Sequence, residues 1–578
     1  MTGNSSIRRS TELTGGEAVV EALESEGVDL LFGLPGISIL PIYDRLYFSS
    51  KIRHLTVKHE ASAAIMADMY GRLTGSVGVC LTIAGPGATN AVTAVAQAYD
   101  AASPMIHISG AELGGGKYEY FHGVDEPDFL RKIFEPITKW SYRIESVEEI
   151  PQALAKAFRI AQSGRTGPVH IEVPWDVLES RGCVNEYVKQ PPMESEPTED
   201  AVRDLANILS TAEKPLIIVG RSVLRCFASK EVTDLAEILS APIVVTAFEP
   251  SIIPSNHPLL VGNIGYYVSA SSIEYFAKNP IIVDLFREAD TILSVGVRLG
   301  TPESELLKKA AATRIIHIDV EENKFREEYD LYKEVVCDIK IFLERLNAEL
   351  RRRGSVKKRP HLVRLIGESK ESLRRKLDEA VVKFRNAKPI HPAVAVKELR
   401  KVLDRDAIVV SDVGMCQAWL KDYFEVYMPN SYIDPGCYGS MGFALPAAIT
   451  AKLVFPDRQI AAVMGDGAFL MSLGEFHTAV ENDLAIMVVI LNDSKYNSIW
   501  HTQKSRYDGR FIACDLQPSH FSEYAKVYGV KGLRVTEPSQ LNLAYEEALS
   551  SKEPSIVEVL IDHRVGLARY SVFAKHLR

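Results

Sequence analysis

The sequence has little that would suit a membrane protein or a nucleic-acid-binding protein. No run of roughly 18 or more apolar residues occurs, so a membrane-spanning helix is not expected. The segment from Met1 to Thr14 is polar and lacks the apolar stretch of a secretory signal peptide. The net charge of −9 is spread along the chain, which argues against a nucleic-acid partner. We therefore expect a cytoplasmic protein with no membrane and no nucleic acid as its partner.

Cysteine is also scarce. The seven cysteines are widely scattered and none forms a C-x-x-C pair, so the sequence indicates neither a zinc site nor a disulfide framework. We expect reduced thiols. What the chain does have is length and apolar material: 578 residues, of which 46% are hydrophobic, should form about three to four domains.

Three segments repeat one pattern of short apolar runs separated by helical stretches. The predicted strands are 29–32, 77–83, 105–109 and 169–173; 216–219, 243–246, 291–295 and 314–318; and 407–410, 459–464, 486–491 and 555–559. Strands that alternate with helices form βαβ units and parallel sheets. The predicted fold is therefore α/β, with three doubly wound parallel-sheet domains.

The joints between these domains differ in composition from the domains themselves. We predict domains at 12–188, 198–350 and 387–570, and the segment 189–198 between the first two is rich in Pro and Glu. The linker 351–386 is heavily charged and begins with three arginines. It could form a patch for an anionic ligand, but we favour a solvated helical connector.

Two acidic residues follow neighbouring apolar runs in the third segment. Gly465-Asp466-Gly467 comes directly after the strand 459–464, and Asn492-Asp493 comes directly after 486–491. The carboxyl ends of parallel strands meet at one edge of a sheet, where ligands bind in open α/β folds. Glycines there allow close approach of a bulky anion. A few oxygen ligands with room left for phosphate oxygens suit Mg²⁺.

This pair of motifs resembles the signature of the thiamin-diphosphate-dependent enzymes, which begins G-D-G and ends N-N. The resemblance implies thiamin diphosphate and Mg²⁺ as cofactors, with Asp466, Asp493 and the backbone carbonyl of Lys495 as metal ligands. It also places Gly465, Gly467 and Ala468 beside the cofactor. Asp493 stands where the family most often has Asn, which adds a negative charge.

A glutamate begins a predicted helix in the first segment. Apolar residues recur at helical spacing from His59 to Arg72, so Glu60 lies near the helix start, where a carboxylate also simply favours the helix dipole. The whole stretch is similar to the H-E-x-x-A-x-x-x-A-x-x-Y-x-R run of the acetolactate-synthase-like branch of the family. That resemblance implies a catalytic role: Glu60 hydrogen-bonds the aminopyrimidine ring and promotes loss of the thiazolium C2 proton.

Four further loops resemble cofactor-binding loops of this family. The resemblance implies cofactor contacts from Gly33, Pro35, Gly36, Gly85 and Asn90 at the pyrimidine, and from Gly414, Met415, Cys416, Gly439, Ser440 and Met441 elsewhere. Met441 would be the apolar wedge that bends the cofactor. Met415 and Cys416 replace a Gln and a His, so backbone N–H groups must carry more of the anion binding. Cys416 could be a reactive thiol, but we favour a small buried filler.

The positions that resemble substrate and nucleotide contacts differ from the family pattern. His122 stands where synthases have Gln, and it is either an acid/base beside the substrate or an exposed loop histidine. Arg298–Pro302 replaces an R-F-D-D-R-like stretch that binds FAD, so FAD, ADP or no nucleotide are equal expectations for the middle domain. The acceptor-selecting tryptophan is expected near Thr502, yet the nearest is Trp500.

Three functions remain open at this point. The first is an acetolactate-synthase-like carboligase that decarboxylates a 2-oxo acid and ligates the product to an acceptor carbonyl. The second is a decarboxylase or lyase, of 2-oxo acid, benzaldehyde-lyase, 2-hydroxyacyl-CoA lyase or oxalyl-CoA decarboxylase type. The third is a non-catalytic regulatory homologue, against which the intact Glu60, Asp466 and Asp493 argue. The resemblance also implies a homodimer at least, with a tetramer favoured, and a small 2-oxo acid or acyl donor as substrate.

Overall fold

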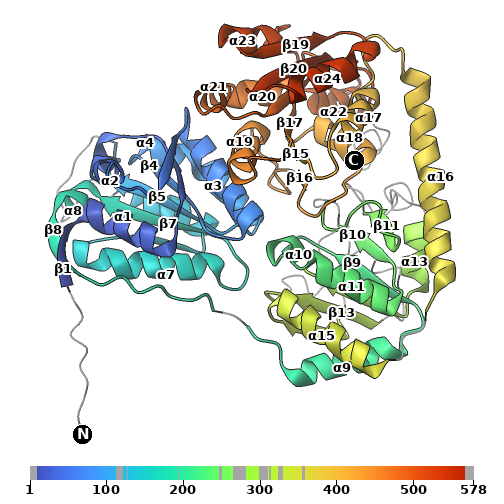
Figure 1. The fold of residues 1–578 in the computed structure, drawn as a ribbon, viewed down its shortest axis with the longest axis horizontal. Helices are drawn as coiled ribbons and strands as arrows, with labels where there is room; N and C mark the ends of the chain where they lie inside the picture. Colours follow the sequence, from blue (N-terminus) through green and yellow to red (C-terminus); the bar gives the residue numbers. More distant parts are fainter. Residues whose placement is uncertain are drawn as a thin grey trace. The chain divides into compact units, whose positions relative to one another are not determined.

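The computed structural model describes residues 10–111, 122–126, 128–193, 195–246, 250–264, 281–298, 307, 310, 314–322, 330–354 and 358–566. They fall into two compact units, residues 1–193 and residues 194–578. Figure 1 labels the elements along the chain. Among the described residues, none of the helices combines the length and the apolar character needed to cross a membrane.

The first unit is built on a six-stranded parallel sheet. Its order is β3 (Arg53–Thr56), β2 (Leu30–Gly33), β4 (Gly78–Thr82), β5 (Met105–Ala111), β7 (Pro168–Pro174) and β6 (Trp140–Arg143). The unit also contains a two-stranded antiparallel sheet of β1 (Ser10–Thr14) and β8 (Arg181–Asn185). Its main helices are α1 (Gly15–Glu26), α2 (Leu40–Leu46), α3 (Glu60–Thr74), α4 (Pro86–Asn90), α5 (Val92–Asp100), α6 (Phe129–Phe134), α7 (Ile150–Gln162) and α8 (Trp175–Glu179).

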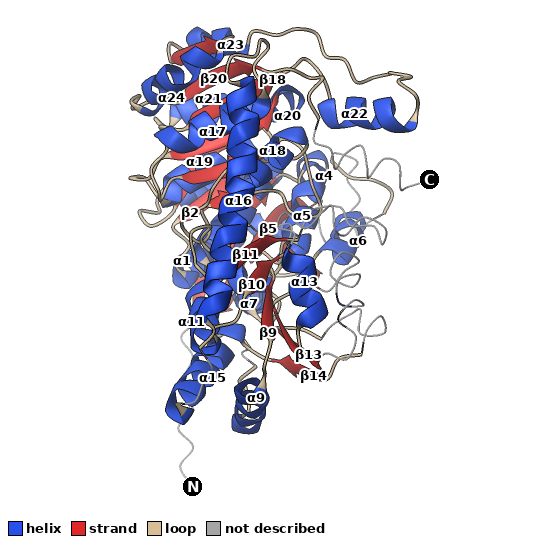
Figure 2. Ribbon diagram, turned by 90° about the vertical axis from the view of Figure 1, so that its right-hand side faces the viewer, coloured by secondary structure: helices blue, strands red, loops and turns tan. Residues whose placement is uncertain are grey.

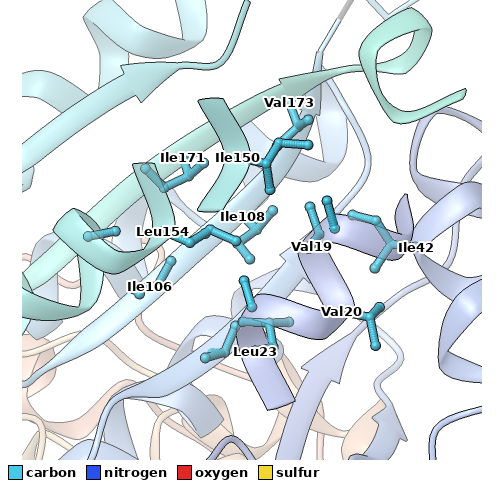
Figure 3. Close-up of a cluster of buried hydrophobic side chains, with 14 of the residues drawn as sticks. Val19, Val20, Leu23, Ile42, Ile106, Ile108, Ile150, Leu154, Ile171 and Val173 are labelled. Carbon is cyan, nitrogen blue, oxygen red and sulfur yellow. The ribbon is translucent and has the colours of Figure 1, made fainter. Parts of the chain in front are cut away.

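The central strands of this sheet are mostly apolar and are covered on both faces. Every residue of β4, β5 and β7 is buried, as is typical of parallel sheets covered by helices. On one face, Val19 and Leu23 of α1 and Leu154 of α7 pack on Ile106 and Ile171 of the sheet (Figure 3). Helix α3 packs on β2, β4 and β5. The sheet therefore holds the loops at its carboxyl edge on a rigid base.

The second unit contains two more six-stranded parallel sheets. The order of the first is β11 (Leu260–Asn263), β10 (Ile243–Val245), β9 (Pro215–Val219), β12 (Thr291–Val295), β13 (Arg314–Asp319) and β14 (Lys333–Val336). The order of the second is β16 (Tyr432–Ile433), β15 (Ile408–Ser411), β17 (Ile460–Gly465), β18 (Met487–Asn492), β20 (Ser555–Leu560) and β19 (Lys531–Val535).

Helices flank both of these sheets. Those of the β9 sheet are α9 (Glu199–Thr211), α10 (Ser222–Arg225), α11 (Ser229–Leu239), α13 (Ile281–Glu288) and α15 (Ile339–Arg353). Those of the β17 sheet are α17 (Pro392–Val402), α18 (Met415–Tyr423), α19 (Ala444–Val454), α20 (Asp466–Ser472), α21 (Gly474–Glu481), α22 (Asn497–Arg506), α23 (Phe521–Val527) and α24 (Leu541–Leu549). The prediction of three doubly wound parallel sheets is confirmed.

A single long helix, α16 (Pro360–Phe384), follows the first of these sheets and precedes the second (Figure 2). Of its 25 residues only Ile366 is buried. At its start the guanidinium of Arg359 donates to three backbone carbonyls, those of Ala212, Glu213 and Leu239. The charged segment thus has the helical, solvated character expected of a connector.

All twelve predicted strands form, with ends shifted by two residues at most. The three sheets lie inside the domain limits 12–188, 198–350 and 387–570, which as boundaries stay predictions. The described cysteines are free, as expected.

Candidate active site

In the first unit, two glycine-containing loops follow neighbouring strands at the point where the strand order changes direction. β2 has β3 on one side and β4 on the other, and such switch points are where α/β sheets bind ligands. A Cβ on Gly33 would lie 2.6 Å from the Leu81 carbonyl oxygen, and one on Gly36 would lie 2.4 Å from Ile83 Cδ1. The loop from Gly33 through the exposed Pro35 to Gly36 therefore packs against the end of β4 only because both glycines lack side chains.

Glu60 lies at the same carboxyl edge, just after β3. It is the first residue of α3, and the ring Nδ1 of the preceding His59 accepts a hydrogen bond from the Ala61 N–H at 3.2 Å, which caps the helix. Glu60 is only 7% exposed. Asn90 Nδ2 donates to Glu60 Oε2 at 2.9 Å, and a Cβ on Gly87 would lie 3.1 Å from Glu60 Oε1. The predicted helix start is confirmed, and three predicted contributors, Glu60, Asn90 and the glycine loop, come together.

His122 contributes its backbone to the same loop. Gly85 has a φ of +59°, and a Cβ there would lie 2.0 Å from the His122 carbonyl oxygen. His122 itself has a φ of +68° and is half-buried. The histidine therefore lies beside the loop that contains Gly85, which was predicted to contact the pyrimidine ring of the cofactor. Its neighbour Phe121 lies outside the described residues. A catalytic role for His122 stays a prediction.

In the second unit, the two predicted metal ligands follow adjacent strands. β17 pairs with β18 in parallel register, Gly465 opposite Leu491, so Asp466 and Asp493 emerge at one edge. Asp466 is 3% exposed, begins α20, and accepts the Gly467 N–H at 2.9 Å. The backbone turns at Ser494, whose φ is +55°, and the Lys495 N–H donates to Asp493 Oδ1 at 3.2 Å. This convergence is the arrangement that the sequence predicted.

The electrostatics of these two carboxylates favour a cation. Burial raises the pKa of Asp466 to about 6 against the lowering effect of backbone N–H groups. Burial and the neighbouring Asp466 charge raise the pKa of Asp493 to about 7. Nowhere in the described part of the chain do three or more His, Cys, Asp or Glu side chains gather in a metal-holding cluster. Two carboxylates that repel each other, with few further protein ligands, fit a Mg²⁺ ion that takes its remaining oxygens from phosphate and water.

A buried aspartate that the sequence-based prediction omitted organises the neighbouring loops. Asp412 follows β15 and is fully buried. Its carboxylate accepts N–H groups from Val413 (2.9 Å), Gly442 (3.2 Å) and Ala444 (2.9 Å), while burial raises its pKa to about 6. Asp412 thereby joins the 412–416 loop to the 439–444 loop. An acid directly after an apolar strand was the available signal, as it was for Asp466.

The loops that Asp412 joins have the open backbone of an anion site. Gly414 has a φ of +104°, and neither Gly414 nor Gly465 has an atom within 4 Å of the place a Cβ would take. Met415 is buried at the start of α18. The buried Cys416 donates its S–H towards the carbonyls of Asp412 and Val413, both at 3.4 Å, and burial raises its thiol pKa. Cys416 is therefore a packed filler rather than a reactive thiol.

Three more predicted residues lie in the second of these loops. Gly439 and Gly442 have positive φ values, +68° and +81°, and they flank the half-buried Ser440 and Met441. In helix α20, a Cβ added to Gly467 would lie 2.5 Å from Tyr496 Cε1, and the next residue, Ala468, is buried. The loop geometry leaves Met441 partly accessible, as a wedge beneath a cofactor requires.

Comparison with known proteins identifies this arrangement. Family models match residues 13–120 (thiamine pyrophosphate enzyme, N-terminal TPP binding domain), 202–346 (central domain) and 412–559 (C-terminal TPP binding domain). The chain is 33% identical to the "Probable acetolactate synthase large subunit" of Methanocaldococcus jannaschii, over 95% of this chain and 92% of the relative. It is 31% identical to the acetolactate synthase isozyme 1 large subunit of Escherichia coli, over 97% and 96%.

The chain belongs to the thiamine pyrophosphate enzymes. Within that family it is an acetolactate-synthase-like enzyme, and its two TPP-binding domains contain the two loop systems described above. Both the resemblance drawn from the motifs and the expectation of an enzyme are confirmed.

In this thiamine pyrophosphate enzyme, Trp500 lies on helix α22. Trp500 is 9% exposed and stacks on Phe511 with ring centroids 4.9 Å apart. Gln503 Nε2 also donates to the Ile512 carbonyl at 2.9 Å. Trp500 is thus a packing residue of the α22 segment. The amide of Asn497, which the sequence-based prediction also omitted, donates to Asp493 Oδ2.

The central domain repeats the switch-point geometry. β9 lies between β10 and β12, and a Cβ on Gly220 would lie 2.3 Å from the Gly296 carbonyl oxygen. Of the stretch expected at a nucleotide, Arg298 is described and residues 299–302 lie outside the described part of the chain. FAD and ADP remain expectations here.

Proposed function

We propose that this thiamine pyrophosphate enzyme is a Mg²⁺-dependent carboligase that decarboxylates a small 2-oxo acid and ligates the product to an acceptor carbonyl. The observation that carries the proposal is the buried Glu60 at the head of α3, held by Asn90, in a chain that also retains Asp466 and Asp493. A non-catalytic homologue has no need of these groups. The relatives that cover nearly the whole chain are named acetolactate synthases, which supports carboligation.

The residues of the first unit supply proton control. Thiamin diphosphate, when bound, supplies an acidic carbon that attacks carbonyl groups and stores the electron pair released by decarboxylation. Because Asn90 occupies Glu60 Oε2, the other oxygen, Oε1, is the one that would share a proton with a ring nitrogen of the cofactor. Burial of Glu60 excludes water from that exchange.

The residues of the second unit hold the anionic end of the cofactor. Asp466, Asp493 and the Lys495 carbonyl are the groups that would hold Mg²⁺, which would offset the negative charge of the diphosphate oxygens. The free backbone positions at Gly414 and Gly465 leave room for those oxygens. Asp412 keeps the two loops in register by binding three backbone N–H groups.

The test is product analysis with pyruvate, thiamin diphosphate and Mg²⁺. Acetolactate as the main product would support carboligation. Acetaldehyde alone would contradict it and show a decarboxylase. The absence of turnover over a panel of 2-oxo acids, with the cofactor demonstrably bound, would overturn the choice of a 2-oxo acid as substrate.

We further propose that the active unit is at least a homodimer, with a tetramer as the favoured assembly. The two halves of the site belong to different compact units of the chain, and in enzymes of this family the cofactor bridges two chains. Light scattering of the cofactor-bound protein checks this. A monomer that turns over pyruvate would contradict it.

The central domain is proposed to hold FAD or ADP at the loops around Gly220 and Gly296. Spectra of the purified protein and of the supernatant after heat release separate these cases. A flavin spectrum indicates FAD, and adenine absorbance alone indicates ADP. The absence of both signals would contradict a resident nucleotide.

A further inference from the structure

The residue at the start of helix α22 is bonded to a proposed metal ligand. Asn497 is the first residue of α22, and its Nδ2 group donates to Asp493 Oδ2. The same amide lies 3.3 Å from the His563 carbonyl oxygen, towards which it also donates. The other oxygen of Asp493, Oδ1, accepts the Lys495 N–H. Asp493 is therefore held from both sides by the segment that follows it.

The Asn497 side chain is buried and its acceptor is unused. Asn497 is only 9% exposed, and in the described part of the chain its Oδ1 atom has no hydrogen-bond partner. An unpaired buried amide oxygen destabilises the folded state. Such a cost is typical of a side chain whose orientation is set by another requirement, here the bond that its N–H₂ group makes to a carboxylate.

Helix α22 is anchored through the same backbone carbonyl. His501 is one turn after Asn497, and its Nε2 atom lies 3.0 Å from the His563 carbonyl oxygen. The Trp500 and His563 rings meet edge to face, 5.2 Å between centroids. Lys495, which precedes α22, also forms an ion pair with Asp515, which follows the helix in the sequence. The orientation of Asp493 and the seating of α22 therefore depend on one set of contacts.

We infer that Asn497 is a positioning residue for the metal site: it fixes the Asp493 carboxylate and couples metal binding to the order of helix α22. The inference rests on the proposed Mg²⁺ site. The physical reason lies in the extra charge. An Asn ligand brings no charge, whereas Asp493 faces Asp466 with a second negative charge, and a donated amide N–H offsets that repulsion while limiting rotation of the carboxylate.

The experiment measures Mg²⁺ affinity by titration calorimetry of the full chain with saturating thiamin diphosphate. Asn497→Ala should weaken Mg²⁺ binding by roughly tenfold or more, as is typical when a group that orients a metal ligand is lost. Asn497→Asp, which keeps the shape but replaces the donor with a second anion, should weaken it further. The matched control is Asn482→Ala, which removes an amide that donates to the Thr478 carbonyl at 2.9 Å.

A second measurement separates positioning from a general loss of folding. Amide hydrogen exchange of α22 should slow on Mg²⁺ addition in the wild-type chain and in Asn482→Ala, but not in Asn497→Ala. In an Asp493→Asn background, the Asn497→Ala effect on Mg²⁺ affinity should shrink, because the paired charge is gone. This double-mutant cycle measures the Asp493–Asn497 bond itself.

The outcomes are distinct. Equal Mg²⁺ affinity in the wild-type chain and both Asn497 variants, or unchanged coupling of α22 exchange to Mg²⁺, would overturn the role of Asn497 alone. A wild-type chain that binds thiamin diphosphate without any requirement for Mg²⁺ would overturn the metal assignment, and with it this inference.

Discussion

At the scale of single residues, two buried carboxylates differ in how many hydrogen-bond donors occupy them. Among the described residues, Asn90 donates to one oxygen of the buried Glu60, which leaves the other oxygen for the proposed contact with the cofactor. Asp412 is also a carboxylate and is even more buried, but three backbone N–H groups donate to it, so it serves the loops. The two carboxylates thus differ in how many hydrogen-bond donors of the protein already bind their oxygens, and this separates the proposed proton-handling acid from the structural one.

The first prediction concerns Glu60. Glu60→Gln keeps the shape and the Asn90 contact region but cannot hold the proton, so cofactor binding should persist while exchange of the C2 proton slows by about 10²–10⁴-fold. Proton exchange followed by NMR in the cofactor-bound enzyme measures this. The exposed Glu135, changed to Gln, is the control, and unaltered exchange in Glu60→Gln would rule out the assigned role.

At the scale of elements, the loops at the carboxyl edges depend on glycines that meet other backbones. Gly85 combines a φ of +59° with a Cβ position 2.0 Å from the His122 carbonyl oxygen. Gly27 has a φ of +85° but open space around its Cβ position. Substitution of these two glycines therefore separates two costs. One is the cost of a side chain in the left-handed conformation, and the other is the cost of a Cβ that collides with a neighbouring backbone.

The second prediction uses that pair. Gly27→Ala should lower the free energy of unfolding by about 1–2 kcal/mol, the left-handed cost alone. Gly85→Ala should cost more and should also weaken thiamin diphosphate binding, because the 84–90 loop must shift away from His122. Denaturant unfolding and cofactor titration check both. Equal losses of stability with unchanged cofactor affinity would contradict the loop argument.

A buried layer of polar side chains between strands has a pH consequence. His107 on β5 bonds the Thr82 hydroxyl at 2.8 Å, and burial lowers its pKa from 6.5 to about 3. His170 on β7 lies between the hydroxyls of Ser109 and Ser141, each at 2.9 Å, and burial lowers its pKa well below 6.5. Both rings are therefore neutral in the folded sheet.

The third prediction follows from the sign of these shifts. A histidine whose folded pKa is lowered contributes its full stability above the unfolded value near 6.5, and that contribution is lost as the pH falls below it, by about 1.4 kcal/mol per pH unit per group. His107→Gln should flatten the fall in unfolding free energy between pH 6.5 and 5. The exposed His477, changed to Gln, should not. An identical slope in His107→Gln and wild type would refute the assignment.

At the scale of the whole molecule, the residues of the proposed site come from both compact units. Glu60 and Asn90 belong to the first unit, and Asp466, Asp493 and Asp412 belong to the second. A cofactor that bridges such halves stabilises whichever assembly brings them together, because a ligand shifts an equilibrium towards the state that binds it.

The fourth prediction is that removal of Mg²⁺ weakens the assembly. Chelation in the presence of thiamin diphosphate should shift the protein towards smaller species on dilution, and it should lower the melting temperature. Sedimentation velocity with and without added Mg²⁺ measures the shift. Re-addition of Mg²⁺ should restore the assembly, and an assembly indifferent to Mg²⁺ at every concentration would contradict the bridging argument.

Central strands and edge strands of the sheets differed in how far sequence could predict them. The twelve central strands are mostly apolar, as suits strands covered on both faces, and all were predictable. Edge strands such as β6 (Trp140–Arg143) and β19 (Lys531–Val535) are mostly half-buried and carry Arg or Lys. These short segments lack the buried apolar run that predicts a strand. They become strands through pairing with a neighbouring strand.

The amino-acid sequence by itself determined the α/β class and the three sheets, and it supplied the candidate residues of both proposed half-sites, because apolar runs and short acidic or glycine motifs are local features. Tertiary structure decided which further polar side chains position the residues of these half-sites. Asp412 carries no local mark of its partners, because it acts through a loop 30 residues away. Asn497 lies only four residues after Asp493, but the bond between them depends on how helix α22 is oriented. Long-range hydrogen bonds such as those of Asp412 depend on how the loops pack, which is a property of the folded domain.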